Sequence, residues 1–152
     1  MSALAINKKA SFDYELLDRY EAGLVLFGYE VKAVRNDLAS LKGSYISLRT
    51  KNNKTELYLI NCHIAPYKQA GPLPDYDPTR ERKLLLKRGE ISHLLGKKKE
   101  EGLTLIPLKI YTNHSFLKLE FAVARGKKKF DKRETIKKRE TDRQLRSLTK
   151  RG

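Results

Sequence analysis

Residue types able to do acid–base or nucleophilic chemistry are few in this sequence and widely spaced. Cleavage of RNA by general acid–base catalysis would need two of the histidines, His63, His93 and His114, to converge beside a lysine or arginine. The three histidines fall in three different predicted elements, which favours surface or structural roles. The single cysteine, Cys62, lies in a predicted strand, where a buried and inert thiol is expected. One cysteine allows neither an internal disulfide nor a cysteine-cluster zinc site.

Motifs for nucleotide cofactors and metals are also missing from the sequence. It contains no phosphate-binding loop, no dinucleotide-binding glycine motif and no HExxH zinc motif. The GKKK strings at 96–99 and 126–129 lack the surroundings of a phosphate-binding loop. We therefore expect no enzyme, no metal and no cofactor. A histidine-dependent ribonuclease stays open as the less favoured alternative.

The charge of the chain indicates a polyanionic partner. The 152 residues include 33 Lys and Arg against 18 Asp and Glu, a net charge of +15, and such a surplus attracts nucleic acid. An anionic membrane is the rival partner, but the chain has no Trp, no strongly amphipathic basic helix and no apolar run near the roughly 18 residues that span a bilayer. The apolar stretch at its start is too short for the hydrophobic region of a signal peptide. We expect a reduced, cytoplasmic setting and no membrane.

The last part of the chain carries much of this charge. Residues 126–152 hold 12 basic and 4 acidic residues but few apolar ones. So few apolar side chains cannot offset an ordering cost of about 1 to 2 kcal/mol per residue. The segment lacks proline and pairs Glu134 with Lys138 at helical spacing, so an external anion could order it as a helix. We predict a folded domain at 1–125 and a basic tail at 126–152 that is disordered when free; a tail serving solubility alone is the alternative.

The elements that must position these residues are mainly strands. The hydrophobic pattern predicts strands at 21–27, 45–49, 56–64, 103–112 and 116–124 and helices at 29–38, 79–87 and 90–101. Two adjacent asparagines favour a turn between the second and third strands, and Asp77 with Pro78 predicts the start of the helix at 79–87. About six strands with inserted helices indicate a small closed or partly open barrel of the OB-fold type. Such barrels often bind oligonucleotides.

Five strings of the sequence resemble a known family. They are NKKA at 7–10, EAG at 21–23, GYEVKAVR at 28–35, DPTRERKLLL at 77–86 and GKKKFDKRE at 126–134. In order, spacing and total length they resemble the small protein B (SmpB) family, the bacterial SsrA-binding partners of transfer-messenger RNA (tmRNA) in ribosome rescue. Since five separate strings match in register, the resemblance is specific and covers nearly the whole chain.

This resemblance implies an RNA-binding adaptor of trans-translation. The barrel would bind the tRNA-like domain of tmRNA and, with alanyl-tmRNA and elongation factor Tu, enter a 70S ribosome that lacks a codon in its A site. The body would stand in for the codon–anticodon half of a transfer RNA. The tail would fold as a helix in the empty mRNA channel beside the decoding centre.

The resemblance also assigns RNA-binding residues on the body. Asn7, Glu21, Leu85 and Lys118 match the family's RNA-binding positions, and so does the basic run Arg125, Lys127 and Lys128. Lysines and arginines can neutralise phosphates, and an apolar side chain such as Leu85 can pack on an unstacked base, although a core position for Leu85 is about equally expected. Glu21 would accept hydrogen bonds from a base or orient a basic neighbour. The matching strings add further candidates: Lys8, Lys32, Arg35, Arg82 and Lys83. Glu30 is interpreted first as a carboxylate near a helix N-terminus.

The tail residues are assigned to the ribosome by the same resemblance. The ribosome-contacting candidates are Phe130, Asp131, Lys132, Arg133, Ile136, Lys137, Lys138 and Arg139. Phe130 stands where relatives carry an aromatic residue or histidine, so ring stacking is kept. Thr141 replaces a tryptophan found in some members. A basic structural ribosomal protein remains the alternative function from another class, and it would be bound to ribosomes permanently rather than recruited.

Overall fold

The computed structural model describes residues 3–98, 102–127 and 139–140 as a mainly β chain with short inserted helices. In chain order the elements are β1 (Ala3–Ile6), α1 (Ala10–Asp13), β2 (Tyr14–Leu24), α2 (Gly28–Arg35), β3 (Ala39–Ser40), β4 (Tyr45–Lys51), β5 (Lys54–Ile60), β6 (His63–Ile64), the 3-10 turn η1 (Lys68–Ala70), β7 (Arg82–Leu85), α3 (Arg88–Lys98), β8 (Leu103–Asn113) and β9 (Phe116–Gly126).

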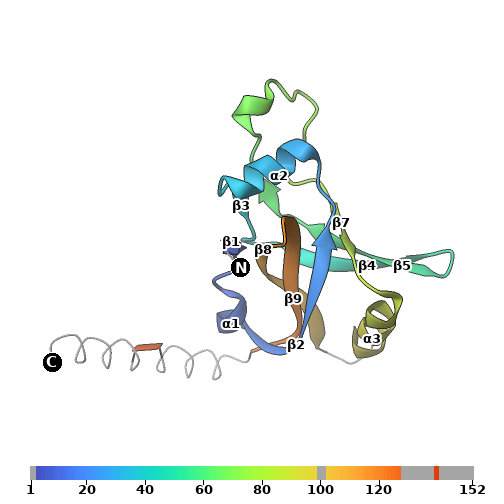
Figure 1. Ribbon diagram of the computed structural model, residues 1–152. Coiled ribbons are helices and arrows are strands. Elements are labelled where there is room, and N and C mark those ends of the chain that lie inside the picture. Colours follow the sequence, from blue (N-terminus) through green and yellow to red (C-terminus); the bar gives the residue numbers. More distant parts are fainter. Residues whose placement is uncertain (1–2, 99–101, 128–138, 141–152) are drawn as a thin grey trace.

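Seven of the strands form one antiparallel sheet. Its order is β1-β8-β9-β2-β7-β5-β4, and β3 pairs with β6 in a separate two-stranded sheet. The strands of the larger sheet curl round until β4 contacts β8, which gives a small barrel with an open seam (Figure 1). The prediction of a mainly β barrel with inserted helices is confirmed.

The core fills the inside of this barrel. Alternate residues of the strands point inward, among them Leu57, Leu105 and Phe121, which are fully or almost fully buried. The helices close the barrel because α2 contributes Val34 and α3 contributes Leu94 to the same core. In Figure 1, α2 covers one end of the barrel, while α1 and α3 lie towards the other. Removal of this apolar surface from water is the main stabilising term.

Two hairpin turns set the register of the strand pairs. Asn52 and Asn53 both have positive φ, 54° and 61°, as a tight two-residue turn requires, and asparagine tolerates this conformation better than most residues. His114 and Ser115 make the corresponding turn between β8 and β9 with φ of 49° and 71°. The predicted strand pairs are confirmed. Strands β4, β8 and β9 are each longer than predicted, whereas β5 ends at Ile60 instead of 64, because Asn61, with a φ of 59°, separates it from β6.

The helix predicted at 79–87 is wrong, because this segment contains strand β7. Asp77 does accept hydrogen bonds from the backbone N–H and the hydroxyl of Thr79, but it closes a turn rather than starting a helix. β7 then pairs with β2 on one side and β5 on the other, and so bridges the two halves of the sheet. The backbone hydrogen bonds of two neighbouring strands outweigh the local helix signal.

Strand β2 also differs from its prediction. It begins at Tyr14 rather than at 21 and ends at Leu24. Its first half is largely exposed and so carries no buried apolar run that would mark it as a strand in the sequence. Long-range pairing with β9, which starts at Tyr14 opposite Gly126, holds this half in the sheet. The short helix α1 was not predicted, whereas α2 and α3 fall within three residues of their predicted starts and ends.

Candidate nucleic-acid interface

The outward face of the sheet brings together several residues that are distant in sequence. Leu85 of β7 lies opposite Gly23 of β2, Gly23 lies opposite Lys118 of β9, and Lys118 lies opposite Tyr111 of β8. Residues paired across strands point to the same face of a sheet. These four positions therefore form one continuous row, which we call the outer-face row. Glu21 lies one position further along the same face of β2.

Gly23 determines how Leu85 sits in this row. A β-carbon at Gly23 would stand 3.3 Å from the Leu85 Cβ, so Leu85 occupies the space that a side chain at position 23 would need. Leu85 is 54% exposed, while its neighbour Leu84 is 3% exposed. The sequence left Leu85 open between a core and a surface position, and the structure places it on the surface. An exposed leucine here is available to a base or another apolar group.

Glu21 is held by a hydrogen bond from another strand. The Tyr111 hydroxyl donates to Glu21 Oε2 across the intervening strand β9. Burial and this bond to a carboxylate raise the pKa of Tyr111 above its ordinary value, so the phenol stays protonated as a donor. Among the described residues, Lys118 forms no salt bridge, which leaves its ammonium group available for a phosphate.

Two large apolar residues that the sequence analysis did not select extend the outer-face row. Phe116 is 70% exposed and shares the outward face of β9 with Lys118. Val25 is 44% exposed and lies just past the end of β2, where its N–H donates to the Lys83 carbonyl at 3.0 Å. The alternation along β9, with Phe116 in phase with Lys118, was the signal that could have found Phe116. Exposed rings beside lysines suit contacts to unstacked bases.

Arg35 and Lys83 border this surface. Arg35 Nη2 donates to the Ser115 carbonyl at 2.8 Å, which ties α2 to the turn just before Phe116. Lys83 shares the outward face of β7 with Leu85 and forms a partly exposed salt bridge with Glu56 at 3.3 Å. Lys32 is exposed on α2. Three of the sequence candidates thus remain accessible to RNA.

Arg82, in contrast, does not belong to the interface, and its prediction as a phosphate contact is wrong. Its side chain is completely buried. The guanidinium donates to Glu30 Oε2 at 2.7 and 2.9 Å and to the carbonyls of Cys62 and Pro78. On a strand the side chains of Arg82 and Lys83 must point to opposite faces, so only one of the two can reach a ligand.

Glu30 is the centre of this buried cluster. Besides Arg82, it accepts a hydrogen bond from Arg80 Nε at 3.1 Å and from the Tyr76 hydroxyl at 3.1 Å, and its Oε1 accepts from the Phe27 N–H at the start of α2. Burial alone would raise the pKa of Glu30, but the bonds from Arg80, Phe27 and Arg82 outweigh it and hold this pKa below its ordinary value. The helix-start role expected from the sequence is present, and the ion-pair role was missed.

The remaining candidates gather around α1, away from the outer-face row. Asn7 donates from its side-chain amide to the Pro107 carbonyl at 2.9 Å, and Lys8 beside it is exposed. Lys127 Nζ donates to the Ser11 carbonyl at 2.8 Å, and Arg125 is exposed near the end of β9. Lys118 and Arg125 are seven residues apart on one strand, roughly 23 Å at about 3.3 Å per residue. The structure therefore divides the predicted body residues into two separate basic regions.

Arg139 is the one tail candidate that the described residues include. Its Nη2 donates to Ser11 Oγ at 3.1 Å, and its guanidinium lies 5.8 Å from the centre of the Phe12 ring. The other tail candidates lie outside the described residues: Phe130, Asp131, Lys132, Arg133, Ile136, Lys137 and Lys138, together with Lys128.

The chemically reactive residue types do not assemble into a site. His63, His93 and His114 lie on β6, on α3 and in the β8–β9 turn, all exposed. Cys62 is buried as predicted, and burial raises the pKa of its thiol to about 11. Within the described ranges, no three His, Cys, Asp or Glu side chains are grouped as metal ligands would be. Nor does that part of the chain contain a helix long and apolar enough to cross a membrane.

Comparison with known proteins gives consistent matches. The profile of the family described as SmpB protein matches residues 4–151. The SsrA-binding protein of Thermosipho africanus (strain TCF52B) is 51% identical over 153 residues, covering 100% of this chain and 99% of the relative. The SsrA-binding protein of Geobacillus kaustophilus (strain HTA426) is 51% identical over 142 residues, 93% of this chain and 88% of the relative. A chain from the solved structure "tmRNA-SmpB: a journey to the center of the bacterial ribosome" superimposes with a TM-score of 0.64 at 46% identity, covering 82% of this chain and 84% of that chain.

Proposed function

Because this chain belongs to the SmpB family, we propose that it is an RNA-binding adaptor of trans-translation that binds tmRNA and takes it to stalled ribosomes. The folded body, residues 1–125, binds the tRNA-like domain of tmRNA. The basic tail, residues 126–152, contacts the ribosome. The protein contributes binding and no catalysis of its own.

The outer-face row is the observation that carries the RNA-binding part of this proposal. It combines Lys118, which has no salt bridge within the described part of the chain, the exposed apolar side chains of Leu85 and Phe116, and Glu21 held by Tyr111. Cations neutralise phosphates, apolar surfaces take unstacked bases, and a fixed carboxylate accepts hydrogen bonds from base edges. RNA loops with splayed bases offer all three kinds of group, whereas a regular duplex hides its bases.

The ribosomal part of the proposal rests on charge and on the family. The tail holds 12 basic residues, enough to follow ribosomal RNA into the empty mRNA channel. Lys132 and Arg133, with Phe130 nearby in sequence, are the residues we propose to contact the decoding centre. The body then stands in for the missing codon–anticodon pair, and elongation factor Tu delivers the complex through alanyl-tmRNA.

Separate variants of the body and of the tail test this division of labour. Lys118→Ala or Glu21→Ala should weaken binding to the tRNA-like domain by about 1 to 3 kcal/mol. The double change of Lys132 and Arg133 to Ala should leave that binding nearly intact and abolish peptide tagging on stalled ribosomes. Equal losses of binding and tagging in both sets would contradict separate roles. Unchanged RNA affinity in both body variants would remove the outer-face row as the binding site.

Sequencing of the RNA that co-purifies with the protein separates this proposal from the alternative of a structural ribosomal protein. A recruited adaptor should bring down one small stable RNA and substoichiometric ribosomes. Stoichiometric ribosomal RNA without tmRNA would favour the permanent ribosomal protein.

A further inference from the structure

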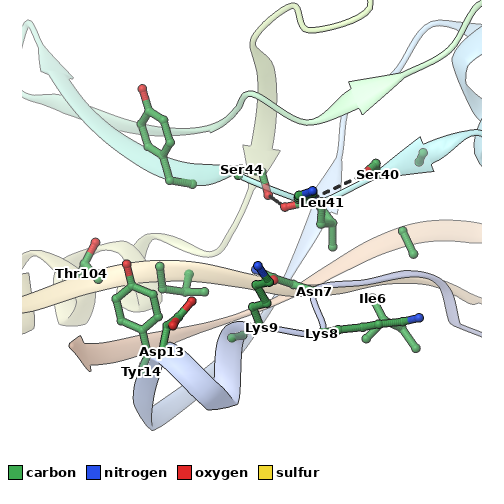
Figure 2. Close-up of a pocket in the computed structure, with 17 residues that line it drawn as sticks. Ile6, Asn7, Lys8, Lys9, Asp13, Tyr14, Ser40, Leu41, Ser44 and Thr104 are labelled. Atoms are coloured by element: carbon green, nitrogen blue, oxygen red, sulfur yellow. Dashed lines mark hydrogen bonds between the residues drawn. The ribbon is translucent and has the colours of Figure 1, made fainter. Parts of the chain in front are cut away.

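A cleft follows the open seam of the barrel. β1 and β4 are the two edges of the seven-stranded sheet, and a cavity of about 830 Å³ lies between them. One wall is the segment from Ala5 to Tyr14, with Thr104 and Ile106 of β8, and the other is the turn from Ala39 to Tyr45 (Figure 2). We call this cavity the seam cleft. Its volume lies in the range of about 300 to 1,000 Å³ that is typical of small-molecule sites.

The first wall is rigid and presents a cation to the cavity. The Asn7 side-chain amide donates to the Pro107 carbonyl at 2.9 Å, and the Asn7 N–H donates to the Leu108 carbonyl at 2.8 Å. These two bonds fasten the wall to β8. From it the Lys9 side chain extends across the gap towards the opposite turn (Figure 2).

The opposite wall is a compact turn that carries a second lysine. Leu41 is 1% exposed and anchors the turn in the core. The Ser44 hydroxyl donates to the Leu41 carbonyl at 2.6 Å, and the Lys42 N–H donates to Ser40 Oγ at 3.3 Å. Gly43, with a φ of 74°, allows the chain to reverse there. Lys42 is therefore presented from a fixed backbone, and it lines the same cavity as Lys9.

Aromatic rings and hydroxyls line the cleft as well. Tyr14 and Tyr45 border it from different elements, and Tyr45 is 46% exposed. Asp13, Tyr14 and Thr104 line one end of the cleft (Figure 2). Lys8 also lines the cavity. The lining therefore includes three lysines and one aspartate, and its net charge is positive.

We propose that the seam cleft binds a single nucleotide, with its phosphate between Lys9 and Lys42 and its base against Tyr45. The paired lysines select an anion, an accessible tyrosine ring selects a planar base, and the cleft volume admits one nucleotide rather than a duplex. The nucleotide belongs either to an unstacked position of a bound RNA or to a free nucleoside monophosphate. The RNA-borne case rests on the proposed function, and it adds a contact region separate from the outer-face row.

Titration of the full-length protein with AMP, adenosine and inorganic phosphate tests this inference by amide NMR. AMP should shift the amides of Lys9, Thr104 and residues 41–45 and should bind about tenfold more tightly than either fragment, because only AMP engages ring and lysines together. Tyr45→Ala and Lys42→Gln should each weaken AMP binding about tenfold, while Tyr45→Phe keeps the ring and the affinity. Lys54→Gln, an exposed lysine on the β4–β5 hairpin, is the control and should change nothing.

A second titration with the tRNA-like domain of tmRNA identifies the source of the nucleotide. Displacement of AMP by the RNA, with weaker RNA binding in Tyr45→Ala, supports an RNA-borne nucleotide. Binding of AMP that the RNA does not displace supports a free nucleotide. Cleft amides that respond to neither ligand overturn the inference, even if the RNA binds through Lys118. Failure of the RNA to bind while AMP still shifts the cleft would instead refute the proposed function.

Discussion

At the scale of single residues, a glycine makes room for the side chain that the interface exposes. Gly23 has no side chain, and the Leu85 Cβ occupies the space beside it. Any β-carbon at position 23 would press on Leu85, which is exposed and free to move outward. The cost of such a change should therefore appear in RNA binding rather than in folding.

We expect Gly23→Val to lower affinity for the tRNA-like domain about three- to tenfold while changing the stability by at most about 1 kcal/mol. Filter binding and chemical denaturation measure the two effects. Gly96→Ala on α3 is the matched control, since a β-carbon at Gly96 meets no atom within 4 Å. It should stabilise the helix and leave RNA affinity unchanged. A Gly23→Val protein that binds RNA normally would show that the position of Leu85 is immaterial.

Glu30, unlike Gly23, matters for folding and not for RNA binding, because it is buried beside Arg82 and outside the proposed interface. Glu30→Gln should cost about 3 to 5 kcal/mol in the free energy of unfolding, since it leaves the buried Arg82 charge without a counter-ion. Denaturant titration measures this loss. Glu56→Gln, which removes the solvent-exposed partner of Lys83, should have little effect. Similar losses in both variants would contradict the special position of Glu30.

The same carboxylate predicts a dependence of stability on pH. The pKa of Glu30 is lower in the folded protein than its ordinary value of 4.5, so the folded state holds this proton less tightly than the unfolded state. The stabilisation is complete above pH 4.5 and is lost as the pH falls below it through the folded pKa. Denaturation at pH 3 to 7 should show this decline in the wild type and a much smaller one in Glu30→Gln. Parallel pH profiles would refute the assignment.

At the scale of elements, β7 separates neighbouring residues into different functions. Arg82 and Leu84 point into the core, whereas Lys83 and Leu85 face solvent. A helix would have placed these four residues around its whole circumference. The strand instead contributes one face to the core and the other to the interface.

Two adjacent leucines therefore should respond differently to the same substitution. Leu84→Ala should destabilise the fold by about 2 to 5 kcal/mol, because it opens a cavity in the core. Leu85→Ala should alter stability little and weaken RNA binding. Thermal unfolding and RNA titration of both variants provide the measurement, and each variant is the control for the other. Equal destabilisation by the two changes would contradict a strand with opposite faces.

At the scale of the whole molecule, the positive charge is divided between the outer-face row, the surroundings of α1 and the tail. Each phosphate contact releases counter-ions from the RNA, so the affinity falls as salt rises. Contacts made by lysine should be visible in the slope of this dependence, whereas contacts made by Leu85 should not.

We expect Lys118→Ala to reduce the slope of log affinity against log salt by about one. Leu85→Ala should lower affinity with an unchanged slope. Binding titrations at several salt concentrations give both slopes, and Lys54→Ala on the β4–β5 hairpin is the control. A slope unaltered by loss of Lys118 would exclude a direct phosphate contact at that position.

Some properties of this protein follow from its sequence alone. The net charge of +15 indicates a polyanionic partner, the alternation along the last two strands predicts a β hairpin, and five strings carry the family resemblance. These features are local or additive, so they can be read without knowing which segments are neighbours. The low apolar content of residues 126–152 is a property of the same kind.

Other properties were decided only by the tertiary structure. Whether Arg82 or Lys83 is accessible, and whether Leu84 or Leu85 is buried, depends on the pairing of β7 with β2 and β5. Gly23 and Leu85 are 62 positions apart, and a shift of register by one residue would exchange every inward and outward side chain. Long-range pairing thus assembled the outer-face row and the seam cleft, because no local pattern specifies which strand lies beside another.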